Sequence, residues 1–304
     1  MQVLYRESSP NGNDSLFMQE TKKIEGILAT LTGPLPGKKL LIIVGIHGNE
    51  PCGINAVKEL LPMIAIERGT LTIALGNPRA VAEKVRFTEK NLNRMFQSDE
   101  RLTPIERVSY EYTRSRELWP LLVEADVLLD IHSSATKDTM PFVVCEPNSF
   151  SIAQALPVPL VSYNWSELEP GATDTLVNES GGMGMCIECG YHEDPSAIER
   201  AKSAILSFLE LSGAITARSA RIPHPQRLIQ VLDLHKTITN FTPARYFKDF
   251  EEVVKYELIG TDGTEPITAQ DDGAVIFVRE RKGPGEEAFL FGKEVEWEEA
   301  YTSV

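Results

Sequence analysis

The chain of 304 residues is 42% hydrophobic and carries 30 basic against 44 acidic side chains, for a formal net charge of −14. It is long enough to bury a large core, in one large domain or in one large and one smaller domain. Its acidic excess opposes binding to nucleic acid or to an anionic membrane surface, so an anionic ligand would have to be drawn in by a local arginine cluster.

The sequence gives no sign of export or of insertion into a membrane. Its first thirty residues are polar, and nowhere do eighteen apolar residues follow one another, so we expect a cytoplasmic protein. The four cysteines fit a reducing compartment rather than a disulfide framework. Cys186 and Cys189 form a Cys-x-x-Cys pair, but they lie in a strand-like segment and lack the second pair of ligands that a zinc knuckle needs. We expect both to be buried in a strand.

Apolar strand-like runs alternate with helical patterns through most of the chain. The near-continuous run 40–46 is typical of a strand covered on both faces, and Pro51 fits the first turn of the helix that follows. Asp194-Pro195 opens a helix with one apolar stripe. The other expected elements are a polar lead-in over 1–24, strands over 26–31, 70–75, 126–132, 142–145, 160–163 and 185–189, a polar helix around 104–118 and a short helix over 148–155.

This alternation predicts an α/β fold with a mixed central sheet flanked by helices, over residues 1–217. Beyond residue 217 the pattern changes to alternating segments separated by Gly, Asp and Pro. That change predicts a smaller β-rich C-terminal domain over 218–304. Its expected strands are 228–238, 253–259, 274–278 and 288–291, and the acidic residues 294–300 fit a short helix or a solvated tail.

Two histidines and a glutamate stand where apolar strands end. His47 and Glu50 follow the run 40–46 across Gly48, which lets the chain reverse, and His132 closes another strand. Open α/β sheets bind ligands at the carboxyl ends of their strands, and His, Glu and a distant His form one catalytic zinc set. We therefore expect one zinc ion per chain, although these ligand types also suit other divalent ions. Asp130 can orient the imidazole of His132 without binding the metal itself, or else form a helix cap or a salt bridge.

Glu188 is a carboxylate within an otherwise apolar strand, where its desolvation costs free energy unless it is hydrogen-bonded or functional. Near a metal it would act as a general base, whereas on a solvated strand edge it would have no such role. Asn93 and Arg94 offer an amide and a planar guanidinium to a carboxylate, and Arg86 can stabilise an oxyanion. Taken singly, each arginine fits a surface charge as well; a metal site nearby favours an anion-binding role.

Together, the segments His47–Glu50, Asn91–Phe96 and Asp130–His132, with Glu188, resemble the succinylglutamate desuccinylase/aspartoacylase family of the zinc carboxypeptidase superfamily. The resemblance covers residues from about 40 to 210, and the β-rich remainder fits the smaller C-terminal domain of that family. It implies a zinc-dependent amidohydrolase that cleaves the amide bond of a small anionic N-acyl amino acid by metal-activated water. The implied roles are metal binding by His47, Glu50 and His132, general base catalysis by Glu188, polarisation of the scissile carbonyl by Arg86, and binding of a substrate carboxylate by Asn93 and Arg94.

Two features of aspartoacylases have no match in this sequence. Residues 172–185 lack the tyrosine and arginine that bind a second substrate carboxylate, and only Tyr246, Tyr256 and Tyr301 are placed to replace the tyrosine of the C-terminal domain. The acyl group and the amino acid therefore stay open. Two other functions also stay open: a carboxypeptidase-like enzyme acting on short or modified peptides, and a non-catalytic protein that retains the metal. Assembly into a homo-oligomer stays open as well.

Overall fold

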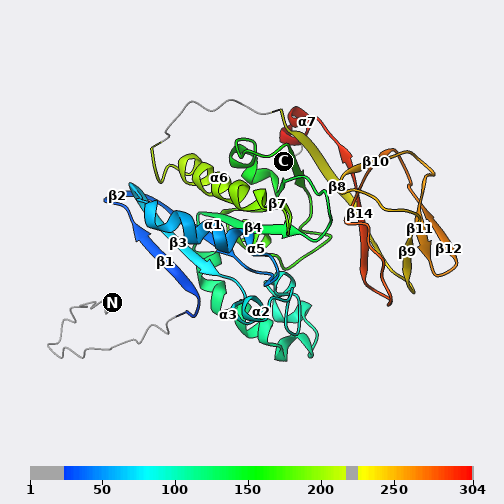
Figure 1. The fold of residues 1–304 in the computed structure, drawn as a ribbon, viewed down its shortest axis with the longest axis horizontal. Coiled ribbons are helices and arrows are strands. Elements are labelled where there is room, and N and C mark those ends of the chain that lie inside the picture. Colours follow the sequence, from blue (N-terminus) through cyan, green and yellow to red (C-terminus); the bar gives the residue numbers. More distant parts are fainter. Residues whose placement is uncertain (1–23, 217–224, 303–304) are drawn as a thin grey trace.

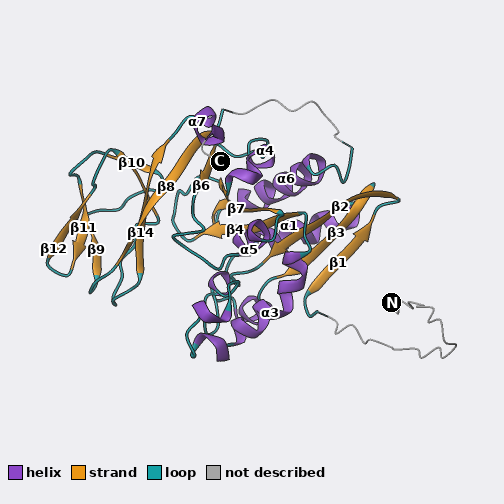
Figure 2. Ribbon diagram, turned by 180° about the vertical axis from the view of Figure 1, so that it is seen from behind, coloured by secondary structure: helices purple, strands orange, loops and turns teal. Residues whose placement is uncertain are grey.

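The computed structural model describes residues 24–216 and 225–302. Within these ranges the chain forms an eleven-stranded mixed sheet flanked by helices and a separate three-stranded antiparallel sheet (Figures 1 and 2). The predicted α/β fold with a mixed central sheet is confirmed. The predicted lead-in over 1–24, apart from Ile24, and the predicted domain boundary at 217 lie outside the described residues.

The order of strands in the large sheet is β1-β3-β2-β4-β7-β5-β6-β8-β14-β13-β10. Strand β2 runs parallel to β3 and β4, β4 runs parallel to β7, and β5 lies antiparallel beside β7. The carboxyl ends of β2, β4 and β7 therefore meet at one edge of the sheet. The strands span Ile27–Thr32 (β1), Leu35–Val44 (β2), Arg68–Leu75 (β3), Val127–Ser134 (β4), Phe142–Cys145 (β5), Leu160–Tyr163 (β6), Met183–Tyr191 (β7), Arg227–Lys236 (β8), Glu251–Val253 (β10), Gly273–Ile276 (β13) and Glu287–Glu294 (β14).

Helices cover both faces of the parallel part of the sheet, as the continuous apolar run in β2 predicts. Its alternate residues separate into two cores, because successive side chains of a strand point to opposite faces. Leu40 and Ile42 pack with α1 and α6, whereas Leu41 and Ile43 pack with α3 and α5. The helices span Cys52–Leu60 (α1), Pro78–Glu83 (α2), Tyr110–Val123 (α3), Phe150–Ala153 (α4), Thr173–Glu179 (α5), Ser196–Leu211 (α6) and Trp297–Thr302 (α7).

Several elements differ from the sequence-based expectation. The expected strand 253–259 is not one strand, because residues 254–257 join Glu251–Val253 to Leu258–Asp262. Strand β2 ends at Val44 because Gly45 has a φ of +68°, which starts the loop that leads to His47. Helix α3 begins at residue 110 instead of about 104, because the hydroxyl of Ser109 accepts the N–H of Tyr112 and caps the helix there. Helix α5 was not expected, since its seven residues lie between glycine-containing loops and carry too short an apolar pattern.

The C-terminal region continues the large sheet, because β8 pairs in parallel with β6 and then carries β14, β13 and β10. Figure 1 shows β8 and β14 extending from the α/β body toward the small sheet. The small sheet consists of β9 (Phe241–Pro243), β11 (Leu258–Asp262) and β12 (Glu265–Thr268), with β11 in the middle. The C-terminal region is thus rich in strands, as predicted, but most of them belong to the central sheet.

The expectations for the cysteines also hold. Cys186 and Cys189 lie in β7, and both are buried free thiols, as are Cys52 and Cys145. Across residues 24–216 and 225–302, no helix is long and apolar enough to cross a membrane.

Candidate active site

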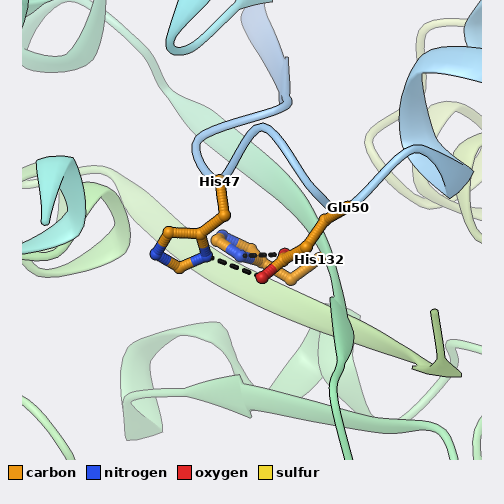
Figure 3. Close-up of side chains that lie close together, drawn as sticks. All are labelled: His47, Glu50 and His132. Carbon is orange, nitrogen blue, oxygen red and sulfur yellow. Dashed lines mark hydrogen bonds and ion pairs between the residues drawn. The ribbon is translucent and has the colours of Figure 1, made fainter. Parts of the chain in front are cut away.

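His47, Glu50 and His132 form a compact cluster at the carboxyl ends of β2 and β4 (Figure 3). Nδ1 of His47 lies 2.8 Å from Oε1 of Glu50, and Nδ1 of His132 lies 3.0 Å from Oε2 of the same carboxylate. The three residues are only 4%, 1% and 2% exposed. One ligand atom from each lies within 4.8 Å of the others, so the cluster could hold a metal ion.

The loop between β2 and α1 positions two of these ligands. Its N–H at Gly48 donates to the carbonyl of Arg86 at 3.3 Å, which joins it to the loop after α2. A Cβ atom at Gly48 would lie 2.0 Å from the carbonyl carbon of Ala80, so only glycine permits this approach. The close packing turns His47 and Glu50 toward the same point.

Other polar side chains orient the two imidazoles. Oδ1 of Asn91 lies 3.0 Å from Nε2 of His47, and Oδ2 of Asp130 lies 3.1 Å from Nε2 of His132. Asp130 in turn accepts a hydrogen bond of 2.6 Å from the hydroxyl of Thr173 on α5. These contacts leave both Nδ1 atoms directed at Glu50, in the arrangement by which carboxylates and amides orient histidine ligands of a metal.

The electrostatics of the cluster match a cation-binding site. Burial lowers the pKa of His47 to about 4, so its imidazole is neutral and keeps a lone pair for a metal. Burial would also lower the pKa of His132, but the carboxylates of Asp130 and Glu50 outweigh it and raise that pKa well above the ordinary value. In the metal-free protein, the protonated imidazole of His132 therefore supplies the positive charge between the carboxylates of Asp130 and Glu50. Two imidazole nitrogens and one carboxylate are a donor set that fits zinc.

Glu188 lies directly opposite His132 in the pairing of β7 with β4. Its Oε2 atom is inaccessible to solvent and has no hydrogen-bond partner among the described residues. Burial and the carboxylate of Glu50 raise the pKa of Glu188 to about 8. A carboxyl group with these properties beside a metal-binding cluster is poised for proton transfer at neutral pH.

A cavity of about 500 Å³ opens over the cluster. This volume suits a small-molecule ligand. Glu50 lies below the cavity wall, with its carboxylate between the two histidines. The other six residues singled out from the sequence all line the cavity: His47, Arg86, Asn93, Arg94, His132 and Glu188.

The two arginines differ in their surroundings. Nη1 of Arg86 lies 3.2 Å from Oε1 of Glu50, and its side chain is 45% exposed toward the cavity. Nη2 of Arg94 lies 2.8 Å from Oε2 of Glu169 and 3.3 Å from Oε2 of Glu287. No sequence pattern indicated two acidic partners for Arg94, because Glu287 is 193 residues away in the chain.

The C-terminal region supplies much of the remaining cavity wall, which the sequence did not reveal. These residues meet the site only because β8 and β14 extend the central sheet, so no local pattern marks them. In the described part of the chain none of Tyr246, Tyr256 and Tyr301 lines the cavity. The C-terminal lining consists of Leu234, Phe277, Arg279, Arg281, Gly285, Glu286, Glu287, Phe289 and Leu290.

Comparison with known families agrees with this geometry. Residues 36–212 match the profile of the succinylglutamate desuccinylase/aspartoacylase catalytic domain, which is more than half of the chain. The chain belongs to this family.

Members of the family with curated names include a probable aspartoacylase of Nostoc sp., 29% identical over 167 residues, which are 50% of this chain and 55% of the relative. An N-acyl-aromatic-L-amino acid amidohydrolase (carboxylate-forming) of Xenopus laevis is 29% identical over 126 residues, 38% of this chain and 41% of the relative. The chain thus spans about half or less of the length of these relatives.

Solved structures of the family share the fold. The succinylglutamate desuccinylase of Vibrio cholerae superposes with a TM-score of 0.72 at 20% identity, covering 86% of this chain and 82% of that one. A succinylglutamate desuccinylase/aspartoacylase of Rhodobacter sphaeroides gives a TM-score of 0.66 at 19% identity, covering 88% of each chain. Both alignments extend well beyond the 36–212 segment, so the shared fold includes C-terminal strands.

Proposed function

We propose that the protein is a zinc-dependent amidohydrolase that cleaves the amide bond of a small anionic N-acyl amino acid, giving a carboxylate and a free amino acid. The observation that carries the proposal is the position of Glu188 beside the His47-Glu50-His132 cluster, at the base of a cavity of small-molecule size. The names of the relatives, which include an N-acyl-aromatic-L-amino acid amidohydrolase and succinylglutamate desuccinylases, support this class of substrate.

His47, Glu50 and His132 would hold the metal, with Asp130 and Asn91 fixing the two imidazole rings. A bound zinc ion supplies Lewis-acid activation of a water molecule and of the substrate carbonyl. The three ligands come from two segments 82 residues apart whose strands are neighbours in the sheet, so the fold brings them together.

Glu188 would move the proton in this reaction. Its carboxylate takes a proton from the attacking water as the new C–O bond forms, and gives it to the nitrogen as the C–N bond breaks. A group that serves as base and then as acid works best with a pKa near the working pH. The pKa of about 8 in the metal-free site is suited to both steps.

Arg86 and the Asn93-Arg94 pair would bind the substrate at either side of the reacting carbonyl. The exposed guanidinium of Arg86 can donate to the oxygen that becomes negative during attack. Asn93 and Arg94 line the cavity and would hold a substrate carboxylate, with that carboxylate replacing Glu287, the more distant of the two acids at Arg94.

The cavity walls favour small substrates over peptides. Residues of the β13–β14 segment form part of the cavity wall, and Glu287 of β14 reaches Arg94, which leaves less room than an open peptide groove. A carboxypeptidase-like activity on short or modified peptides is therefore the second candidate, and a non-catalytic metal protein is the third.

Zinc-loaded protein incubated with a panel of N-acetyl and N-succinyl amino acids tests the proposal, with the release of free amine as the readout. We expect turnover of at least one member, with kcat about 10²- to 10⁴-fold lower in the Glu188→Gln variant. Faster release of C-terminal residues from dipeptides would favour the peptidase instead. If the protein binds zinc but hydrolyses none of these compounds, the non-catalytic metal protein is the candidate that remains.

A further inference from the structure

Arg279 faces the active-site cavity from the C-terminal region. It follows β13, and its backbone N–H donates to the carbonyl of Ala288 on β14 at 2.9 Å. Its guanidinium lies over the ring of Phe277, with 5.0 Å between the guanidinium carbon and the ring centroid. Nη2 donates to the hydroxyl of Thr136 at 3.2 Å, in the loop that follows the strand of His132. The side chain is therefore fixed in place above the site.

Arg279 differs from Arg86 and Arg94 in having no ion pair with a carboxylate among the described residues. Arg86 pairs with Glu50, and Arg94 pairs with Glu169 and Glu287. Among the described residues, Arg279 makes no ion pair with any carboxylate, and its polar contact is to Thr136. The carboxylates of Asp249 and Glu188 attract Arg279 through space, but no salt bridge within residues 24–216 and 225–302 engages its guanidinium, which lines the cavity.

The surroundings of Arg279 make this positive charge costly without a ligand. Burial lowers the pKa of Arg279 from its ordinary value. The carboxylates of Asp249 and Glu188 oppose this shift, and the positive charges of Arg86 and Arg281 add to it. Arg281 is held by a bond of 2.6 Å from its Nε to the carbonyl of Glu287, so it cannot move away freely. A substrate carboxylate in the cavity would offset both the cost of desolvating Arg279 and its repulsion by Arg86 and Arg281.

Arg94 cannot serve a second substrate anion. Its guanidinium already faces two carboxylates, and one of them must leave when a first substrate carboxylate binds. In the part of the chain that the structure describes, Arg279 has no paired carboxylate that must leave before a substrate carboxylate binds. A planar guanidinium whose face stacks on an aromatic ring keeps its edge free for two parallel hydrogen bonds to a carboxylate.

We propose that Arg279 binds a second carboxylate of the substrate, so that the preferred substrates are N-acyl amino acids with two carboxylates. This inference rests on the proposed amidohydrolase function. The first carboxylate would lie at Asn93 and Arg94 and the second at Arg279, since all three residues line the same cavity of about 500 Å³. The second carboxylate belongs either to the acyl group or to the amino acid side chain, and both have the same chemistry.

Matched substrate pairs separate these two sources. N-acetyl-L-glutamate and N-acetyl-L-glutamine differ only in the side-chain carboxylate, whereas N-succinyl-L-glutamine adds a carboxylate on the acyl side. We expect the wild-type enzyme to favour the acidic member of one pair by at least about tenfold in kcat/KM, chiefly through KM, as for loss of one charged hydrogen bond. The pair that shows the preference identifies the source.

The Arg279→Gln variant should lose this preference, because kcat/KM should fall more for the acidic member than for the neutral one, while Arg279→Lys should restore part of it. Arg245→Gln is the matched control, because Arg245 also stacks on a phenylalanine of the C-terminal region but pairs with Glu251 and Glu257. Arg245→Gln should show the same preference for the acidic substrate as the wild-type enzyme. Equal losses on acidic and neutral substrates in Arg279→Gln would overturn the inference.

Equilibrium binding separates this inference from the proposed function. Calorimetric titration of zinc-loaded protein with L-glutamate, L-glutamine and succinate requires no turnover. Weaker binding of glutamate or succinate to Arg279→Gln, with unchanged binding to Arg245→Gln, would support the carboxylate site even if no acyl amino acid were hydrolysed. Turnover in which neither kinetics nor binding depends on Arg279 would reject the site and leave the amidohydrolase intact. Absence of both turnover and binding would reject both.

Discussion

Glu188 and His132 are direct partners in the pairing of two neighbouring parallel strands, β7 and β4. The proposed general base and a proposed metal ligand are thereby held at a distance fixed by the hydrogen bonding of the sheet rather than by loops. Rigid placement of this kind keeps reacting groups in the geometry that catalysis requires.

Replacing Glu188 by Gln should lower kcat by about 10²- to 10⁴-fold, the range expected for loss of a general base. Metal content should not change, because Glu188 is not in the His47-Glu50-His132 cluster. Steady-state kinetics and elemental analysis of the same preparation measure both. Glu193→Gln, an exposed change just beyond β7, serves as the control. A variant that hydrolyses a verified substrate at nearly the wild-type rate would refute the role of Glu188.

Replacing His132 by Ala should remove the stabilisation that zinc gives the fold. Binding only to the folded state stabilises it by about 2.7 kcal/mol when free zinc is about 100 times Kd. Wild type should therefore unfold at a higher temperature with zinc, whereas the variant should show little response. His235→Gln is the control, since His235 contacts Asp262 on the small sheet and lies outside the cluster. A full zinc response in His132→Ala would contradict the metal assignment.

Replacing Asp130 by Asn should weaken metal binding by about 10- to 100-fold, because Asp130 orients His132 without being a ligand. Competition with a fluorescent zinc chelator measures the affinity. Asp126→Asn offers a comparison just before the same strand, where Asp126 accepts the N–H of Lys39. Equal zinc affinities in wild type and Asp130→Asn would show that this contact does not support the metal.

Replacing Asp174 by Asn should change how stability depends on pH in the metal-free protein. Burial, with the carboxylates of Asp130 and Glu146, raises the pKa of Asp174 from 3.8 to about 7. Because the pKa of Asp174 is raised in the folded state, its contribution to the free energy of unfolding is fully present below pH 3.8. That contribution is lost as the pH rises toward 7. Each unit of pKa difference corresponds to about 1.4 kcal/mol.

The variant should therefore gain stability over wild type at pH 8 relative to pH 4, as measured by urea unfolding at both values. Asp233→Asn changes an exposed carboxylate on β8 and should show no such gain. A constant difference between wild type and Asp174→Asn across this range would mean that Asp174 titrates normally in the fold.

Replacing Gly48 by Ala should destabilise the protein and weaken zinc binding together. The added Cβ would lie 2.0 Å from the carbonyl carbon of Ala80, so the loop that carries His47 and Glu50 must move. Thermal unfolding and zinc titration measure the two effects. Gly283→Ala meets only the flexible end of Glu286 at 3.1 Å and serves as the control. A wild-type zinc affinity in Gly48→Ala would show that the ligands tolerate a displaced loop.

The central fold and the metal cluster could be predicted from sequence because their signals are local. The apolar run before His47 marks a strand covered on both faces, and a short motif delivers His47 and Glu50 together. The acidic partners of Arg94 and the place of Arg279 could not be predicted in this way. They depend on how β8 and β14 join the sheet, which no nearby residues specify.

The β13–β14 hairpin is tied by its hydrogen bonds to β14's neighbour β8, while its connecting residues 277–286 reach over the cavity. Such a connection can accept changes of length and side chain without disturbing the strands that carry it. The metal ligands lie on other segments entirely. Enzymes built on this plan can therefore acquire new substrates by exchanging one hairpin tip while keeping a constant hydrolytic centre.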